Sequence, residues 1–252
     1  MIELSGRKVL VTGASRGIGA ACARLFATAG AAVMVHYRHE DAAAERVLEE
    51  LKEIDSSLPH ARFAADVANP RQVKHLFEFI HTLWDGLDCL VNNAGIWVYN
   101  PLAELSEKRL EQTWRVNEKG PFLCAREALP LLRDAADGNI VNISSTAGQR
   151  GEAFYSPYAA SKGAIISATK SWSSELAPGI RVNCVAPGWV DTDMCEQPFA
   201  DGGRQEIEAT IPLGRVAPAE DIAGPVLFLA SPLARHITGE ILNVNGGAAL
   251  AG

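Results

Sequence analysis

The chain lacks several features that mark specialised classes of protein. No run of residues approaches the roughly 20 consecutive apolar residues that a membrane-spanning helix needs, and the first eight residues lack the apolar stretch of a signal peptide. Basic residues form no long block and the formal net charge is −7, which disfavours nucleic acid and anionic membranes as partners. We therefore expect a cytoplasmic protein that acts on small molecules.

Cysteine and histidine are sparse and scattered. The cysteines are odd in number and widely spaced, which indicates reduced thiols rather than a disulfide framework. Neither the cysteines nor the six histidines show the spacing of a metal site. The sequence predicts no metal centre.

What the chain does contain is typical of one α/β domain. Its 252 residues are 48% hydrophobic and 21% charged, which is an ordinary globular composition long enough to bury a sizeable core. Short apolar runs alternate with stretches of helical periodicity, a pattern that favours parallel strands covered by helices on both faces. We expect a single domain over residues 1–252, a Rossmann-type, doubly wound parallel sheet of about seven strands.

The expected elements alternate along the whole chain. Strands are expected at residues 8–12, 32–37, 61–65, 89–92, 139–143, 181–186 and 240–244. Helices are expected at 18–29, 41–53, from Pro70 with Asn69 as N-cap, and at 107–132, 156–176 and 218–230. The segment around 189–213 is polar, contains glycine and is long for a connection, so we expect a substrate loop or lid there.

A glycine-rich turn separates the first expected strand from the first expected helix. From Thr12 to Gly19 it reads TGASRGIG, which departs from the G-x-G-x-x-G spacing but keeps its physical ingredients. Glycines let the backbone approach a pyrophosphate, and the following helix N-terminus offers free N–H groups and a favourable dipole. The turn predicts a dinucleotide site.

The end of the second expected strand favours NADP(H) over NAD(H). An NAD site usually has an acidic side chain here for the adenosine ribose, whereas this chain has Tyr37 and Arg38 and no carboxylate before Glu40. Arg38, together with Arg16 from the glycine turn, is suited to a 2′-phosphate because guanidinium groups bind phosphate strongly. NAD(H) stays an alternative if Arg38 is solvated and an acidic neighbour such as Glu40 reaches the ribose.

Tyr158 and Lys162 lie four residues apart on one face of an expected helix. A lysine charge within reach of a phenol favours the phenolate and draws the phenol's pKa toward physiological pH. Alone, the spacing more often reflects an ordinary surface pair, so its meaning depends on the rest of the chain.

The motifs and their order resemble the short-chain dehydrogenase/reductase family from end to end, in particular its 3-oxoacyl-[acyl-carrier-protein] reductase and glucose dehydrogenase-like branch. The matching segments are Thr12 to Gly19, Asp66-Val67, Asn92-Asn93-Ala94-Gly95, Asn117, Asn142-Ile143-Ser144-Ser145, Tyr158 to Lys162, Pro187-Gly188, Ile237-Thr238-Gly239 and Asn245-Gly246-Gly247.

The resemblance implies a catalytic tetrad of Asn117, Ser145, Tyr158 and Lys162. Tyr158 is the expected proton donor when hydride attacks a carbonyl carbon, and Ser145 hydrogen-bonds the same oxygen. Lys162 binds the nicotinamide ribose and lowers the pKa of the phenol, and Asn117 holds a water that returns the proton. The resemblance also implies that the protein is a homotetramer.

The residues expected at the dinucleotide extend from the adenine to the carboxamide. Asp66 is expected at the adenine, residues 93–95 along the adenosine and 187–192 at the carboxamide. Alternatively, Asp66 only caps a turn. The full set is Gly13, Ser15, Arg16, Gly17, Ile18, Gly19, Tyr37, Arg38, Asp66, Val67, Asn93, Ala94, Gly95, Tyr158, Lys162, Pro187, Gly188, Val190 and Thr192.

The sequence says less about the substrate than about the cofactor. Family members that reduce carrier-bound acyl chains tend to have basic residues just before the fifth and sixth strands, and this chain has Asp137-Gly138 and Pro178-Gly179 there. With a net charge of −7 as well, an acidic carrier meets repulsion, so we expect a free ketone or aldehyde. Aromatic and polar residues in the loops after strands four to six are candidates for its pocket: Trp97, Gln149, Tyr155, Trp189 and Met194.

Other functions use the same residues. A carrier-dependent 3-oxoacyl reductase and an alcohol or sugar dehydrogenase working in the oxidative direction both fit the tetrad. A non-catalytic dinucleotide-sensing regulator is a remote alternative, because such a protein has no need of a complete serine, tyrosine and lysine set.

Overall fold

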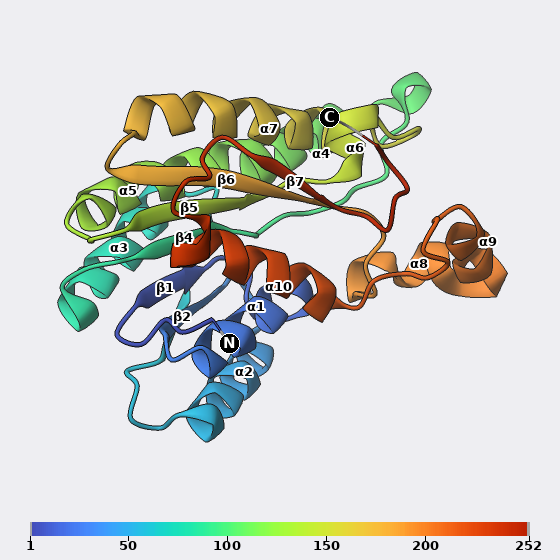
Figure 1. Ribbon diagram of the computed structural model, residues 1–252. Coiled ribbons are helices and arrows are strands. Elements are labelled where there is room, and N and C mark those ends of the chain that lie inside the picture. The colour runs from blue at the N-terminus through green and yellow to red at the C-terminus, as the bar shows by residue number, and fades with distance from the viewer. Residues whose placement is uncertain (1, 251–252) are drawn as a thin grey trace.

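The computed structural model describes residues 2–250 and contains a seven-stranded parallel sheet in the order β3-β2-β1-β4-β5-β6-β7 (Figure 1). The strands are β1 (Lys8–Val11), β2 (Ala32–Tyr37), β3 (Ala61–Ala64), β4 (Cys89–Asn92), β5 (Gly138–Ile143), β6 (Ile180–Pro187) and β7 (Ile241–Val244). The strand order reverses between β1 and β4. In an open parallel sheet, ligands bind beyond the carboxyl ends of the strands at such a point.

Helices cover both faces of the sheet (Figure 1). They are α1 (Gly17–Thr28), α2 (Asp41–Ile54), α3 (Pro70–Trp84), η1 (Leu102–Glu104), α4 (Glu107–Trp114), η2 (Arg115–Lys119), α5 (Gly120–Arg133), α6 (Thr146–Arg150), α7 (Ser156–Leu176), η3 (Asp193–Cys195), α8 (Glu196–Phe199), η4 (Ala200–Gly202), α9 (Gly203–Ala209), α10 (Ala219–Ala230) and η5 (Pro232–Ala234). Within residues 2–250, no helix is long and apolar enough to cross a membrane.

The alternation of side chains along each strand divides the core in two. Val9 and Val11 of β1 pack with α1, α2 and α10 on one face, whereas Leu10 packs with α3 and α5 on the other. Because both faces are buried, the strands read as continuous apolar runs rather than alternating ones. The doubly wound α/β fold expected from the sequence is confirmed.

The helix expected at 107–132 is interrupted. Between α4 and α5, the η2 segment is a π-helical turn in which the Gly120 N–H bonds to the Arg115 carbonyl, five residues back. Pro121 follows at once and has no N–H for the carbonyl four residues before it, which belongs to Asn117. A wide turn therefore replaces the regular helix at Asn117, and such turns often occur at functional sites.

The segment expected as a loop or lid consists largely of short helices, η3 to α9, that lie beside the main body of the molecule (Figure 1). Arg204 of α9 pairs with Asp191 at 2.7 Å and with Glu208 at 3.2 Å, and its guanidinium carbon lies 5.4 Å from the ring centre of Phe199. These contacts give the segment its own internal support.

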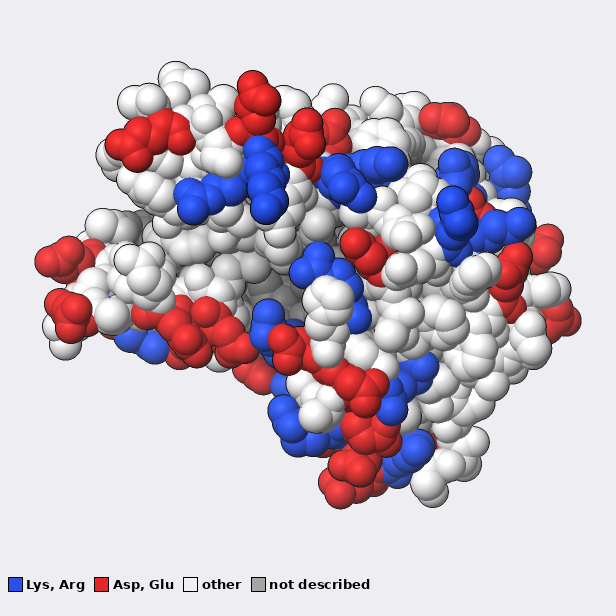
Figure 2. All heavy atoms as spheres, turned by 180° about the vertical axis from the view of Figure 1, so that it is seen from behind, with Lys and Arg blue, Asp and Glu red and all other residues white. Residues whose placement is uncertain are grey.

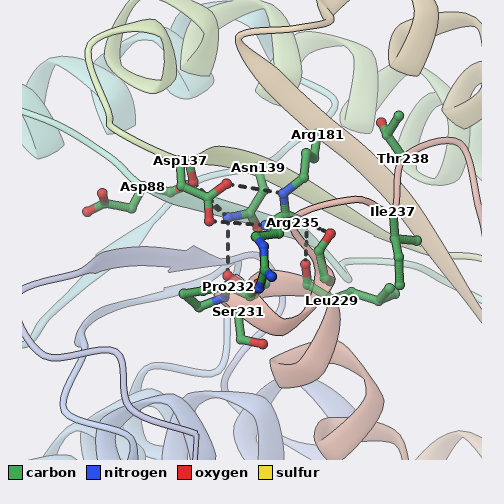
Figure 3. Close-up of polar contacts among 12 residues, drawn as sticks. Asp88, Asp137, Asn139, Arg181, Leu229, Ser231, Pro232, Arg235, Ile237 and Thr238 are labelled. Atoms are coloured by element: carbon green, nitrogen blue, oxygen red, sulfur yellow. Dashed lines mark hydrogen bonds and ion pairs between the residues drawn. The ribbon is translucent and has the colours of Figure 1, made fainter.

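A polar cluster holds together the amino ends of the strands, at the edge opposite the carboxyl ends (Figure 3). Arg181 donates to both carboxylate oxygens of Asp137 at 3.1 and 3.3 Å and to the Leu229 carbonyl at 2.8 Å. Asn139 donates to the Asp88 carbonyl at 3.3 Å. The cluster ties β4, β5 and β6 to the end of α10.

Candidate active site

A cavity of about 610 Å³ opens at the carboxyl edge of the sheet. Turns that follow β1 to β6 line it, so residues from most of the chain meet there. The face shown in Figure 2 is hollowed, and side chains of both charge signs gather at the rim of the hollow. A cavity of this size is typical of a small-molecule site.

The glycine turn after β1 has the shape of a phosphate cradle. Gly13 and Gly17 have φ of +66° and +53°, and a Cβ on Gly13 would lie 2.9 Å from the Ala94 Cα. No side chain caps the N-terminus of α1, which starts at Gly17. Its first N–H groups therefore favour an anion such as a pyrophosphate, and the residues present fit a dinucleotide.

His36 supports this turn and was not singled out from the sequence. Its Nδ1 accepts from the Gly13 N–H at 3.1 Å and its Nε2 lies 2.9 Å from the Ala65 carbonyl oxygen. Burial lowers the pKa of His36 to about 4, so the ring is neutral at physiological pH. The only signal in the sequence was a histidine in an otherwise apolar strand, which more often is a core residue.

Charges of both signs meet where the end of β2 reaches the cavity. Arg16, Arg38 and Glu40 all line it. Arg16 lies 3.6 Å from Glu40 and 3.6 Å from Asp193, and its side chain is 58% exposed. Both guanidinium groups are therefore accessible to an anionic ligand, although Glu40 is close enough to compete for Arg16.

Tyr158, Ser145 and Lys162 line the cavity together. Burial raises the pKa of Tyr158 to about 12, and a hydrogen bond with the Ser145 side chain opposes this rise. Burial lowers the pKa of Lys162 to about 8. The Lys162 Nζ donates to the Ile143 carbonyl at 2.8 Å and lies 5.9 Å from the ring centre of Tyr158.

These pKa values differ from the expectation that the lysine charge lowers the pKa of the phenol. Both groups are withdrawn from water, and removal of solvent disfavours the charged form of each. In this protein burial is the largest cause of the raised pKa of Tyr158, and the group that opposes it is the Ser145 side chain rather than Lys162.

Asn117 lies behind the cavity wall. Its Oδ1 accepts from the Ile96 N–H at 2.8 Å, and its Nδ2 donates to the Ile96 carbonyl at 2.8 Å and to the Ser161 hydroxyl at 3.2 Å. A Cβ on Gly95 would lie 3.4 Å from both the Asn117 Oδ1 and the Lys162 Nζ. The π turn thus sets Asn117 beside Lys162, across a glycine.

Aromatic rings form one wall of the cavity. Trp97 stacks on Tyr155 with ring centres 4.1 Å apart and meets Trp189 edge-on at 6.0 Å. The Trp97 Nε1 donates to the Glu152 carboxylate at 3.2 Å. Glu152 also lines the cavity and was not singled out from the sequence, because a single glutamate in a loop has no distinguishing pattern.

Most of the residues expected at the dinucleotide and the substrate line this cavity. They are Gly13, Ser15, Arg16, Gly17, Ile18, Tyr37, Arg38, Asp66, Val67, Asn93, Ala94, Gly95, Trp97, Ser145, Tyr158, Lys162, Pro187, Gly188, Trp189, Val190, Thr192 and Met194. Asp66 also caps a turn, because its Oδ1 accepts from the Ala68 N–H at 2.9 Å.

Besides Asn117, three expected residues lie outside the lining. A Cβ on Gly19 would approach the Gly13 carbonyl oxygen to 2.3 Å, so this glycine permits close packing of the turn on the helix. Gln149 donates to Asn243 of β7 at 2.5 Å. Tyr155 is the outer partner of the Trp97 stack.

Comparison with known proteins agrees with this geometry. The family model described as enoyl-(acyl carrier protein) reductase matches residues 13–249. The 3-oxoacyl-[acyl-carrier-protein] reductase FabG of Staphylococcus aureus is 39% identical, with 96% of this chain and 97% of that protein covered. The NADPH-dependent aldehyde reductase-like protein, chloroplastic, of Arabidopsis thaliana is 38% identical, with 98% and 95% covered. Among solved structures, a short-chain dehydrogenase/reductase of Brucella melitensis described as glucose/ribitol dehydrogenase matches with a TM-score of 0.89 at 33% identity, with 99% of each chain covered.

Proposed function

This chain belongs to the short-chain dehydrogenase/reductase family and is therefore an NAD(P)-dependent oxidoreductase; on that basis we propose that it uses NADPH to reduce the carbonyl group of a small, free ketone or aldehyde. The observation that carries the proposal is the meeting of Ser145, Tyr158 and Lys162 in one cavity with the glycine turn. Catalysis needs the proton donor and the cofactor within reach of the same carbonyl group, and here the donor side chains and the glycine turn line one cavity.

The side chains have complementary roles in this reaction. NADPH, when bound, supplies the hydride. Tyr158 donates its proton to the carbonyl oxygen as negative charge develops there, and the Ser145 hydroxyl hydrogen-bonds the same oxygen. Lys162 holds the nicotinamide ribose and places a positive charge beside the phenol. Asn117 supports a water beside Lys162 that returns the proton.

The ionisation of Tyr158 supports the reductive direction. With a pKa of about 12 the phenol is protonated at neutral pH, and a protonated phenol is an acid rather than a base. A dehydrogenase that oxidises an alcohol needs the phenolate instead. The dehydrogenase description of the Brucella relative keeps the oxidative direction as an alternative.

NADPH is proposed over NADH because Arg16 and Arg38 flank the end of the cavity where the second strand finishes. Two guanidinium groups suit a 2′-phosphate, whereas a ribose hydroxyl is usually bound by a carboxylate. Glu40 lies 3.6 Å from Arg16 and is the residue through which NADH would bind.

A free substrate is proposed over a carrier-bound one. Asp137 and the Pro178-Gly179 turn directly precede β5 and β6, where a carrier-dependent enzyme tends to have basic side chains. The Asp137 carboxylate is paired with Arg181 at 3.1 Å. The FabG relatives favour the second candidate function, a 3-oxoacyl-[acyl-carrier-protein] reductase.

The same reasoning extends to the whole chain. We propose one catalytic domain with residues 189–213 as a substrate loop, and a homotetramer in the cytoplasm.

The surface of α5 and α7 supports the proposed tetramer. Phe122 on α5 is 45% exposed and packs edge-on against Trp172 of α7 with ring centres 4.8 Å apart, which supports a subunit contact on these helices. All five cysteines are free, which supports a reducing compartment.

The test is a screen of NADPH oxidation against ketones, aldehydes, 3-oxo esters, diketones and sugars, with NADH in parallel. We expect turnover of a free carbonyl compound with a higher kcat/KM for NADPH than for NADH. Tyr158→Phe is expected to lower kcat by about 100- to 10,000-fold, because it removes the proton donor, while NADPH binding measured by fluorescence stays within twofold.

Two results would contradict the proposal. Equal efficiency with NADH and NADPH would remove the cofactor preference. A rate with an acyl-carrier-protein substrate far above that with its free thioester analogue would establish the second candidate function instead.

A further inference from the structure

An acidic side chain lies beside the aromatic wall of the cavity, on the segment between α6 and α7. We propose that this residue, Glu152, selects substrates that carry a hydrogen-bond donor, a hydroxyl or an ammonium group, in addition to the carbonyl that reacts. The inference rests on the proposed function, because it names the substrate class of the same site. Neither the sequence motifs nor the tetrad includes this residue.

The Glu152 carboxylate is held in place by the aromatic wall. Its Oε2 accepts from the Trp97 indole N–H at 3.2 Å. Trp97 in turn is fixed between two rings, the stacked Tyr155 at 4.1 Å and the perpendicular Trp189 at 6.0 Å. A carboxylate fixed in this way is pre-organised, so binding a ligand costs little side-chain entropy.

The backbone around Glu152 adopts an unusual conformation. Gly151 has φ of +79°, and Phe154, which is not a glycine, has φ of +66°. Two hydrogen bonds keep this shape, one from the Tyr155 N–H to the Glu152 carbonyl at 3.2 Å and one from the Asn100 N–H to the Phe154 carbonyl at 3.0 Å. Such strain persists where the surrounding structure enforces it, and it is concentrated at functional sites.

The carboxylate has acceptor capacity that the protein does not use. An ionised carboxylate has room for about four hydrogen bonds. Among residues 2–250, the Trp97 indole is the one donor to the Glu152 side chain, and no basic side chain forms an ion pair with it. Glu152 is half-buried, and burial raises its pKa, although the charge of Arg150 opposes this. A hydrogen-bond donor on the substrate would replace the water that the Glu152 carboxylate loses when it is buried.

Glu152 is also close to the reacting centre. Its charge is one of the causes that raise the pKa of Tyr158, and both residues line the same cavity. One small molecule can therefore place a hydrogen-bond donor at Glu152 and its carbonyl at Tyr158. A hydrogen bond to a charged group typically changes binding about 10- to 100-fold, and the unmet carboxylate would discriminate against an analogue without the donor.

The variant Glu152→Gln distinguishes two roles of Glu152, the selection of substrates and the support of the Trp97 ring. Glutamine keeps an oxygen that accepts the Trp97 N–H, so the aromatic stack is preserved, but it removes the charge. If Glu152 only supported Trp97, this variant would retain the selectivity of the parent enzyme. Glu53→Gln makes the same chemical change on the exposed side of α2 and serves as the control.

The experiment compares cyclohexanone, 4-hydroxycyclohexanone and 4-aminocyclohexanone, which differ in one group opposite the carbonyl. The ratio of kcat/KM relative to cyclohexanone is measured in the parent enzyme and in both variants, and dissociation constants are measured by calorimetry in the presence of NADP⁺. We expect the parent and Glu53→Gln to favour a donor-bearing ketone by about 10- to 100-fold. In Glu152→Gln the preference for 4-aminocyclohexanone should fall to below threefold and that for 4-hydroxycyclohexanone should fall as well, because the glutamine oxygen still accepts a hydrogen bond but carries no charge. Each ratio is taken to cyclohexanone in the same variant, so a change in the rate common to all three ketones cancels.

The two donor-bearing ketones show whether the site prefers an ammonium group or a hydroxyl group. A preference for the amine indicates a cationic substrate, and equal preference indicates a hydroxylated one. The same ratios in Glu152→Gln and in the parent would overturn the inference. If selective binding is present but no carbonyl compound is reduced, the proposed function fails and this inference stands.

Discussion

Tyr158 and Lys162 form a pair whose ionisation is governed by burial. Burial raises the pKa of the phenol to about 12 and lowers the pKa of the ammonium to about 8, so the two values, which are close to each other in water, move apart. The spacing in the sequence predicted that the two would lie together, and the cavity confirms that they do. The expectation that the lysine charge would lower the pKa of the phenol was wrong, because burial raises that pKa and burial depends on residues far away in the chain.

The first prediction concerns the pH dependence of reduction. Below pH 8 Lys162 is charged, and as pH rises through its pKa of about 8 the charge is lost while Tyr158 remains protonated. We expect kcat/KM for NADPH-dependent reduction to be level between pH 6 and 7.5 and to fall about tenfold per unit well above pH 8. Initial rates from pH 6 to 10 test this, with circular dichroism at each pH as the control for unfolding. A level profile up to pH 9.5 would contradict the role of Lys162.

At the level of secondary structure, the interruption between α4 and α5 is the main departure from the sequence pattern. The helical periodicity from Glu107 onward continues across it, so the pattern predicted one helix. The π turn widens the helix by one residue at Asn117, and the asparagine then pairs with both backbone groups of Ile96. Hydrophobic periodicity cannot detect this, because a single wide turn changes the pattern too little.

The second prediction tests this element. Asn117→Ala leaves the Ile96 N–H and carbonyl without their partner, which is expected to lower the free energy of unfolding by about 1–3 kcal/mol and to reduce kcat at least tenfold. Urea denaturation and steady-state kinetics with NADPH measure the two effects.

Asn69→Ala is the matched control for this substitution. Asn69 caps α3 by accepting from the Arg71 N–H at 3.1 Å, so its loss is expected to cost about 1 kcal/mol without any change in kcat. Equal kcat in the two variants would show that Asn117 acts on stability alone.

Across the whole molecule, the carboxyl ends and the amino ends of the strands have different roles. The carboxyl edge holds the cavity, and the amino edge holds the cluster around Arg181 and Asp137 (Figure 3). Arg181 is 8% exposed and makes hydrogen bonds to the Leu229 and Ala234 carbonyls as well as to Asp137. A buried charge with this many partners is expected to matter for stability and not for catalysis.

The third prediction follows from that division. Arg181→Met removes the nearer partner of Asp137, which keeps Arg7 at 3.8 Å, and also removes the donor to the Leu229 and Ala234 carbonyls. It is expected to lower the free energy of unfolding by about 3 kcal/mol, with kcat of the folded enzyme at 25 °C unchanged. Asp137→Asn is the milder variant if the methionine variant does not fold. Chemical denaturation and kinetics measure both quantities.

Arg24→Met provides the comparison at the surface. Arg24 pairs with Glu50 at 2.9 Å, but both side chains are well exposed, so we expect a change below about 1 kcal/mol. If the two arginine variants lost the same stability, burial would not be the cause.

The sequence by itself determined the sheet, its covering helices and the residues that meet at the carboxyl edge. Local signals such as the glycine turn, the apolar runs and the Tyr158 motif are short in the chain and need no distant contact to be recognised. The tertiary structure decided the pKa values of Tyr158 and Lys162, the support of Gly13 by His36, and the place of Glu152 beside Trp97. Each of these depends on burial or on contact between residues far apart in the chain, and such contacts exist only once the chain has folded.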